Sequence, residues 1–225
     1  MWKKLLLPTA VLWTVVLCFE RSMEPSGIDQ DRTSAATRRG IQAQVKSLAE
    51  DLKSAKDKHD GQLVQRSHWG LAQAYWQLNR LDLADAHIRQ FLTGRESSIG
   101  VGNPGLLDGL RAAAGIARDR GKFDEAKRYY RRALAIAERA YGEGCPQAAA
   151  DLDNLGVVCF LEALGQADRV QKQAALQQAA RYIQSALDAC WKAGPGSSSL
   201  QAVVLRNRSL LLTESGIQGK RTTRI

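Results

Sequence analysis

The chain has 225 residues, of which 44% are hydrophobic and 24% are charged. This composition fits one globular domain with extensions and excludes a largely disordered chain. The formal net charge of +9 is explained either by a solvated basic face or by attraction to an acidic partner, an anionic membrane surface or a nucleic acid. Strand patterns are sparse, so the sequence predicts an all-α fold.

The first 21 residues are predicted to be a signal or membrane-anchor segment. Lys3 and Lys4 precede an apolar run from Leu5 to Phe19, which is typical of an export signal and short for a spanning helix of about 20 residues. An uncleaved anchor through residues 2–19, a cleaved signal, a lipid anchor at Cys18 and a buried helix all stay open. If anchored, the lysines would keep the amino terminus cytoplasmic and place the rest of the chain on the other side.

Residues 22–37 mix proline, glycine, serine and charged side chains, which predicts a linker. A helical pattern follows over residues 38–60, and its apolar stripe comprises Ile41, Val45, Leu48, Leu52 and Ala55. This helix either caps the end of a stack of helices or forms a short coiled coil that dimerises the protein.

Residues 121–142 predict one long amphipathic helix that a glycine turn opens. Ala126, Tyr130 and Ala133 recur at helical spacing and share one face, whereas cationic side chains occupy the other. Such a helix cannot bury its apolar stripe alone, so a partner helix is needed. Residues 106–120, directly upstream, supply that helix.

Similar helix pairs recur along the chain. A small residue of the first helix lies at Ala72, Ala114, Gly156 and Ser209, at steps of 42, 42 and 53 residues. An alanine of the second helix follows 12, 12 and 23 residues later, at Ala84, Ala126 and Ala179. The third pair therefore carries 11 extra residues near 163–173. This insertion either makes a dedicated contact or is a tolerated loop.

These pairs resemble tetratricopeptide repeats, in the longer form seen in kinesin light chains. The resemblance implies an α-solenoid of antiparallel helix hairpins over residues 61–217, with about three repeats, capping helices and a basic tail at 218–225. In repeat one we expect helices over 62–78 and 81–93 and then a loop over 93–105. In the half repeat, Ser209 and Leu212 would occupy the motif positions.

The resemblance also implies a concave groove lined by the first helix of each repeat. The candidate groove residues are Trp69, Gln73 and Trp76; Arg111, Arg118 and Asp119; Asp153, Asn154, Val157 and Phe160; and Arg206, Asn207 and Leu210. Asn154 and Asn207 have the same repeat phase, and in similar repeats an asparagine there binds the backbone of an extended peptide. Gly70 and Ala112 depart from this pattern, so the implied clamp is partial.

Charge and aromatic character suggest what the groove would hold. Arg111, Arg118 and Arg206 would bind an acidic segment or a terminal carboxylate, and Trp69 and Trp76 would anchor an apolar side chain. The alternative is that these residues only pack against neighbouring helices or solvate the groove.

No motif for catalysis, metal binding or nucleotide binding is convincing. The histidines do not cluster at metal-ligand spacing, no P-loop occurs, and the G-x-G-x-x-G at Gly100 follows a helix rather than a strand. Cys145, Cys159 and Cys190 lack framework spacing, which favours buried free thiols; a Cys159–Cys190 bridge after export stays the alternative. We therefore expect no cofactor, no metal, no catalytic residue and no nucleic-acid partner.

The sequence predicts a non-catalytic interaction module that binds a protein segment, at or across a membrane. The alternative is a structural subunit or assembly factor packed permanently in a larger membrane-associated complex. The oligomeric state stays open.

Overall fold

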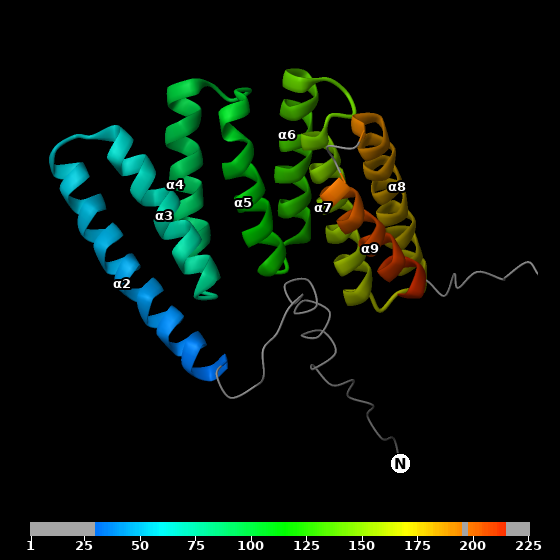
Figure 1. Cartoon of the computed structure of the whole chain (residues 1–225), viewed down its shortest axis with the longest axis horizontal. Coiled ribbons are helices and arrows are strands. Elements are labelled where there is room, and N and C mark those ends of the chain that lie inside the picture. Colours follow the sequence, from blue (N-terminus) through cyan, green and yellow to red (C-terminus); the bar gives the residue numbers. More distant parts are fainter. Residues whose placement is uncertain (1–29, 195–197, 215–225) are drawn as a thin grey trace, which may run out of the picture. The chain divides into compact units, whose positions relative to one another are not determined.

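The computed structural model describes residues 30–194 and 198–214, so the predicted segment 1–21 and tail 218–225 lie outside the described residues. The described part is all-α, which confirms the predicted class, and its eight α-helices pack as sequential antiparallel pairs (Figure 1). They are α2 (Gln30–Asp57), α3 (Gly61–Gln77), α4 (Leu81–Ile99), α5 (Leu107–Asp119), α6 (Phe123–Tyr141), α7 (Pro146–Gly165), α8 (Arg169–Ala193) and α9 (Ser198–Glu214). A short 3₁₀ helix, Pro104–Leu106, precedes α5.

The chain divides into two compact units, residues 1–42 and 43–225. The first unit is described only as the opening part of α2, from Gln30 to Gln42, which is largely exposed. The second unit contains the rest of α2 and all the repeats. No helix among the described residues combines the length and the apolar composition needed to cross a bilayer.

The helix pairs are in the register that the sequence predicts. The small residues of the first helices, Ala72, Ala114 and Gly156, and the alanines of the second helices, Ala84, Ala126 and Ala179, are all buried. A Cβ atom placed on Gly156 would lie 2.6 Å from Cγ1 of Ile183 on α8. Small residues are therefore needed here because the paired helices approach too closely for a larger side chain.

Three apolar clusters form the core of the repeat unit. The first joins α3, α4, α5 and α6 to the start of α7 and includes Ile88 and Leu110. The second joins α7, α8 and α9 and includes Ile183 and Leu187. A smaller one between α5, α6 and α7 contains Tyr130, and burial raises the pKa of that phenol to about 12. Each cluster spans neighbouring repeats, as stacking of hairpins requires.

Helix α4 is longer than predicted. We expected a loop from Thr93, but the helix continues to Ile99. The segment contains no proline, and the hydroxyls of Ser97 and Ser98 donate to backbone carbonyls four residues earlier. The helix ends only at Gly100, whose φ of 86° suits glycine.

The insertion in repeat three lengthens both flanking helices. Helix α7 runs to Gly165 and α8 starts at Arg169, so a short turn joins them. The Asp168 side chain accepts a hydrogen bond of 2.8 Å from the backbone N–H of Gln171, which caps α8.

The predicted phase of the half repeat is wrong. Ser209 and Leu212 are exposed on α9, whereas Val204, Asn207 and Leu211 face the neighbouring helices. In a full repeat the small residue makes room for that repeat's own second helix. Within the described residues α9 has no second helix, so its buried face is set only by contact with α7 and α8.

Helix α2 begins at Gln30, inside the segment predicted as a linker, and residues 30–37 contain no proline or glycine to stop it. The predicted stripe is the inward face of the helix in the second unit. Ala55 is fully buried, and Leu48 lies against Gly70 of α3, where an added Cβ would come within 2.9 Å of it. The capping helix and the coiled coil both remain predictions.

Candidate partner-binding surface

Arg111, one of the predicted groove residues, forms an ion pair that joins α5 to α7. Arg111 donates from Nε and Nη2 to the two carboxylate oxygens of Asp151, at 2.7 and 2.8 Å, and from Nη2 to the carbonyl of Gln147 at 3.1 Å. Asp151 is fully buried. The hydrogen bond to Asp151 raises the pKa of Arg111; burial raises the pKa of Asp151, and Arg111 opposes that rise. Arg111 therefore joins neighbouring repeats and is already engaged within the chain.

A buried polar pair joins α7 to α9. Asn207 and Asp153 are 4% and 5% exposed, and Nδ2 of Asn207 donates to both carboxylate oxygens of Asp153, at 2.8 and 3.1 Å. Burial raises the pKa of Asp153 to about 6. Asn207 therefore does not present its amide to a peptide, and Asn154 at the same predicted phase donates to the carbonyl of Ala150 within α7.

Trp76 links α3 to α5. Its Nε1 donates to Oδ2 of Asp119 at 2.7 Å, and Nε of Arg118 donates to Oδ1 of the same carboxylate at 2.8 Å. The ring covers Gly115, where a Cβ would lie 2.5 Å from the indole. Trp76 therefore packs against the next repeat, which accounts for a glycine at this helix position.

The remaining candidates separate into buried and exposed residues. Phe160 and Val157 are 8% and 9% exposed, so they contribute to the core rather than to an open groove. Gln73 and Arg206 are exposed on α3 and α9, and Leu210 is half-buried. The structure thus does not bring all the predicted groove residues together on one accessible surface.

Trp69 does line an open pocket. This pocket, of about 530 Å³, lies between α3, the last turns of α4 and the start of α5. The residues that line it are Gln62, Gln65, Arg66, Trp69, Phe91, Arg95, Gly105, Asp108 and Gly109. The rings of Trp69 and Phe91 pack at a centroid distance of 5.0 Å. Gly109 permits this approach, because a Cβ there would lie 2.8 Å from the Phe91 ring.

The pocket combines this aromatic floor with unsatisfied polar atoms. Nε of Arg95 and Oε1 of Gln65 are buried and have no hydrogen-bond partner, and buried polar atoms ordinarily have one. Arg66 adds an exposed guanidinium. The acidic residue is Asp108, whose side chain is 88% exposed and lies 4.0 Å from Arg111. The polar groups of the pocket are thus the guanidinium donors of Arg66 and Arg95, the acceptor Oε1 of Gln65 and the carboxylate of Asp108.

Sequence reasoning identified Trp69 but missed the rest of this pocket. The α3 residues could have been predicted to lie together: Gln62, Arg66 and Trp69 are spaced by four and three residues and therefore share a face of the helix. Arg95 could not have been added to them, because the predicted end of α4 placed it in a loop.

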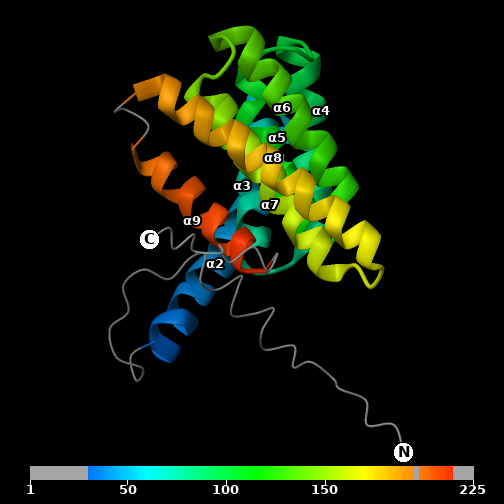
Figure 2. The same ribbon diagram turned by 90° about the vertical axis from the view of Figure 1, so that its right-hand side faces the viewer.

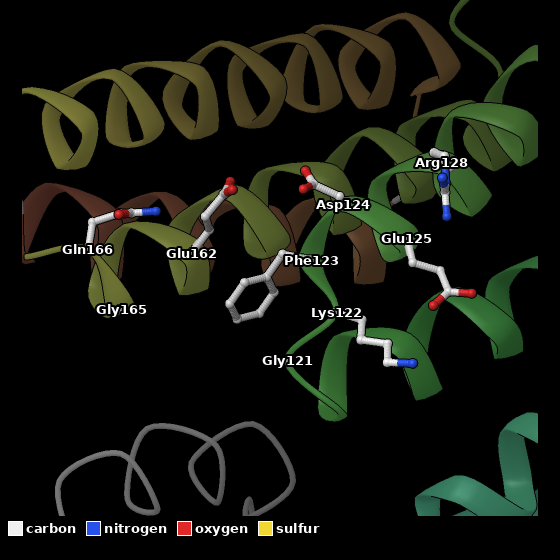
Figure 3. A pocket seen from close by; sticks show the side chains of 9 residues that line it. All are labelled: Gly121, Lys122, Phe123, Asp124, Glu125, Arg128, Glu162, Gly165 and Gln166. Atoms are coloured by element: carbon white, nitrogen blue, oxygen red, sulfur yellow. The ribbon is translucent and has the colours of Figure 1, made fainter.

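A second pocket, of about 410 Å³, lies where the α5–α6 turn meets the end of α7 (Figure 3). Phe123 lies between Gly121 and the α7 residues Glu162 and Gly165. Nζ of Lys127 pairs with Glu162 at 3.0 Å. This pocket reaches the inserted segment through Gly165 and Gln166.

The described residues include no group of three or more histidine, cysteine or acidic side chains suited to hold a metal ion. His68 and His87 lie in contact, with their Nδ1 atoms 2.9 Å apart, and this contact was not predicted. Burial lowers the pKa of both histidines, and Lys56 lowers each further. Cys145, Cys159 and Cys190 are buried free thiols, as predicted.

Family models and a solved structure match parts of this chain. A family model described as tetratricopeptide repeat matches residues 105–175, and a second model with the same description matches residues 65–93. No curated protein sequence matches the chain. Among solved structures, BtubC (BKLC) from P. vanneervenii is similar with a TM-score of 0.58 and 20% identity, over 79% of this chain and 67% of that chain. At this identity the likeness concerns the fold alone.

Proposed function

Because this chain is a tetratricopeptide repeat protein, we propose that it is a non-catalytic module that binds a segment of another protein through the Trp69 pocket. Stacked helical repeats commonly present extended binding surfaces. The observation that supports this site is the pairing of the Trp69–Phe91 floor with two guanidinium groups, those of Arg66 and Arg95, beside buried polar atoms that lack partners.

The chemistry of the pocket suits an extended segment with an apolar side chain next to an acidic group. The apolar side chain would lie on the Trp69–Phe91 rings, because buried aromatic contacts supply much of the energy at protein interfaces. A carboxylate would accept hydrogen bonds from Arg66 and Arg95, since a guanidinium binds a carboxylate with two parallel N–H donors. The partner is therefore a protein with an acidic or extended segment.

The test is recovery of a partner from native membranes with the full chain, followed by mass spectrometry. Arg66 is exposed, so Arg66→Glu should reverse the local charge without unfolding the chain. We expect at least about tenfold less of the partner with this variant, since charge-assisted pairs at interfaces are worth more than 1.4 kcal/mol.

Arg131→Glu is the matched control, because Arg131 is also an exposed arginine but lies on α6 and lines neither pocket. It should recover the partner as well as the unchanged chain does. Equal recovery by all three proteins would rule out the Trp69 pocket as the binding site.

We also propose that residues 2–19 hold the protein at a membrane, with the repeats on the non-cytoplasmic side. The basis is the sequence: Lys3 and Lys4 precede the apolar run from Leu5 to Phe19. In intact cells, a protease added outside the membrane should then cleave the repeats, and alkaline washing should leave the chain in the membrane fraction. Release by alkali together with protection from the protease would contradict this arrangement.

A second candidate function is that of a structural subunit held in a larger complex through the extended α7–α8 hairpin. The pocket beside Gly165 and the exposure of Val170 (77%) favour a contact there. Val170→Glu should then release the protein from the complex on a native gel, whereas Arg66→Glu should not. The reverse pattern would favour the Trp69 pocket.

A further inference from the structure

Helix α9 is the last described helix of the chain and lies against α7 and α8 (Figure 2). Its inward face contributes Val204 and Leu211 to the apolar cluster that also contains Phe160 of α7. The same face carries Asn207, which is paired with Asp153 of α7, and both of these polar side chains are buried. The docking of α9 therefore combines apolar burial with a carboxylate–amide pair.

The carboxyl group of Asp153 is buried without a cation beside it. Asp151, two residues earlier on α7, is also buried, but it binds the guanidinium of Arg111. Burial raises the pKa of Asp153 to about 6, and among the described residues the group that opposes this rise is the amide of Asn207, which is uncharged. A buried carboxylate that lacks a cation tends to take up a proton, because burial penalises its charged form.

The amide of Asn207 has an unused acceptor. Its Nδ2 donates to both carboxyl oxygens of Asp153, at 2.8 and 3.1 Å, whereas its Oδ1 is buried and has no hydrogen-bond partner. An ionised carboxylate cannot supply the missing donor, because it only accepts hydrogen bonds. A protonated Asp153 can donate its O–H to Oδ1 while its other oxygen accepts from Nδ2. Protonation therefore lets the acid and the amide satisfy each other.

The groups that face Asp153 from α8 and α9 do not titrate between pH 5 and pH 7. On α8, burial and then Asp153 raise the pKa of the Cys190 thiol, so it stays neutral. On α9, the arginines on either side of Asn207 in the sequence, Arg206 and Arg208, are exposed and stay cationic. Arg111 of α5 binds the other buried carboxylate of α7, which lies on a different face, since residues two apart do not face the same way.

We propose that Asp153 and Asn207 form a pH-sensitive latch, which holds α9 against α7 while Asp153 is protonated and weakens as Asp153 ionises. The end of a stack of repeats can open locally without unfolding the rest. When α9 leaves, the Asp153 carboxyl meets water and its pKa returns toward the ordinary value of 3.8, so the docked state binds the proton more tightly. The contribution to docking is therefore fully present below pH 3.8 and is lost as the pH rises through about 6.

Opening of the latch uncovers an apolar surface. Val204 and Leu211 are buried while α9 is docked, and undocking exposes them together with the residues of α7 and α8 that they cover. The latch thus sets the pH at which this end of the repeats becomes available for contact. The inference goes beyond the proposed function and does not depend on the Trp69 pocket.

The experiment is hydrogen exchange of the full chain at pH 5 and pH 7, with the intrinsic rate at each pH divided by the measured rate to give a protection factor. Amides in 204–211 should lose about tenfold of their protection between pH 5 and pH 7, because the proton bound to docked Asp153 at pH 5 is lost by pH 7. Asp153→Asn cannot titrate, and its amide can still pair with Asn207, so its protection should be equal at both pH values. Asp188→Asn is the matched control: Asp188 is an exposed carboxylate on α8, and this variant should keep the tenfold loss.

Equal protection of α9 at both pH values in the unchanged chain would overturn the latch, and so would a tenfold loss that persists in Asp153→Asn. Carbon-13 NMR of the Asp153 carboxyl carbon in the unchanged chain tests the same group without a variant. Its signal should titrate near pH 6, and titration near the ordinary value of 3.8 would contradict the proposal. Recovery of a partner by Arg66→Glu is a separate measurement, so failure of one proposal does not affect the other.

Discussion

Asp151 is a fully buried carboxylate on α7, and Arg111 of α5 is its ion-pair partner across the repeat boundary. Removal of one member of such a pair leaves a buried charge without compensation. We therefore predict that Arg111→Ala lowers the free energy of unfolding by about 3 kcal/mol, measured by urea denaturation followed by circular dichroism.

The control for this prediction is Arg128→Ala, an exposed arginine on α6, which should change stability by less than about 0.5 kcal/mol. If Arg111→Ala unfolds at the same urea concentration as the unchanged chain, the pair is not structural. Because we expect loss of stability, a charge reversal at Arg111 cannot test partner binding cleanly, which is why Arg66 serves that purpose.

The His68–His87 contact makes stability depend on pH. Burial lowers the pKa of both imidazoles below the ordinary value of 6.5, so the unfolded chain binds protons more readily than the folded one. The stability that the two neutral histidines contribute is therefore fully present above pH 6.5. It is lost as the pH falls from that value through their lowered pKa values in the folded chain. We predict that the free energy of unfolding falls between pH 7 and pH 5, by up to about 1.4 kcal/mol per pH unit for each histidine.

Urea denaturation across that pH range measures this slope, and the double variant His68→Gln with His87→Gln should show a smaller one. Asp153 acts in the opposite direction: its pKa is raised to about 6, so its contribution is lost as the pH rises toward 6. A slope that is the same in the variant and in the unchanged chain would show that the histidine pair does not titrate with folding.

Contacts between individual side chains were the least predictable part of the candidate partner-binding surface. The 42-residue period indicates which small residues are buried, because each repeat uses them in the same way. It does not indicate that Arg111 meets Asp151, 40 residues away in the sequence, since that pairing depends on the offset between helices of different repeats. Phe160 was likewise misplaced because repeat phase alone does not show how far a neighbouring helix covers the groove.

At the scale of one helix pair, Gly156 sets the distance between α7 and α8. A methyl group there would lie 2.6 Å from Cγ1 of Ile183 and 3.3 Å from the carbonyl oxygen of Ala179. Both neighbours are held in the helix pair, so relief requires the helices to move apart. We predict that Gly156→Ala lowers the free energy of unfolding by about 1–3 kcal/mol, measured by thermal or urea denaturation.

Gly165→Ala is the matched control, because Gly165 ends the same helix and an added Cβ would have no atom within 4 Å. It should be neutral or slightly stabilising, since alanine favours a helix over glycine. A similar loss of stability in both variants would mean that helix spacing does not explain the choice of glycine.

The sequence predicted which helices exist better than it predicted where each helix ends. The apolar periodicity places every helix from α2 to α9, because a repeat needs two amphipathic helices to bury one core. The end of α4 was placed too early because the segment after Thr93 is polar and begins with Gly94, yet it contains no proline before Pro104 to stop the helix. Serine hydroxyls that bond to the preceding turn sustain the helix there.

At the scale of the whole molecule, the repeat unit carries two large apolar clusters that share no residue. One includes Ile88 on α4, and the other includes Ile183 on α8. In a stack of repeats, each hairpin touches mainly its neighbours, so stability is roughly a sum of local terms. Damage to one end should therefore stay at that end.

Ile88 and Ile183 occupy the same position in repeats one and three and are 0% and 2% exposed, so they form a matched pair for this test. We predict that Ile183→Ala costs about 3 kcal/mol and speeds hydrogen exchange in α7, α8 and α9 while the amides of α3 and α4 keep their protection. Ile88→Ala should show the mirror pattern, with faster exchange in α3 and α4. Uniform acceleration along the chain in either variant would contradict the local-term account, because it would mean that the repeats unfold as one cooperative unit.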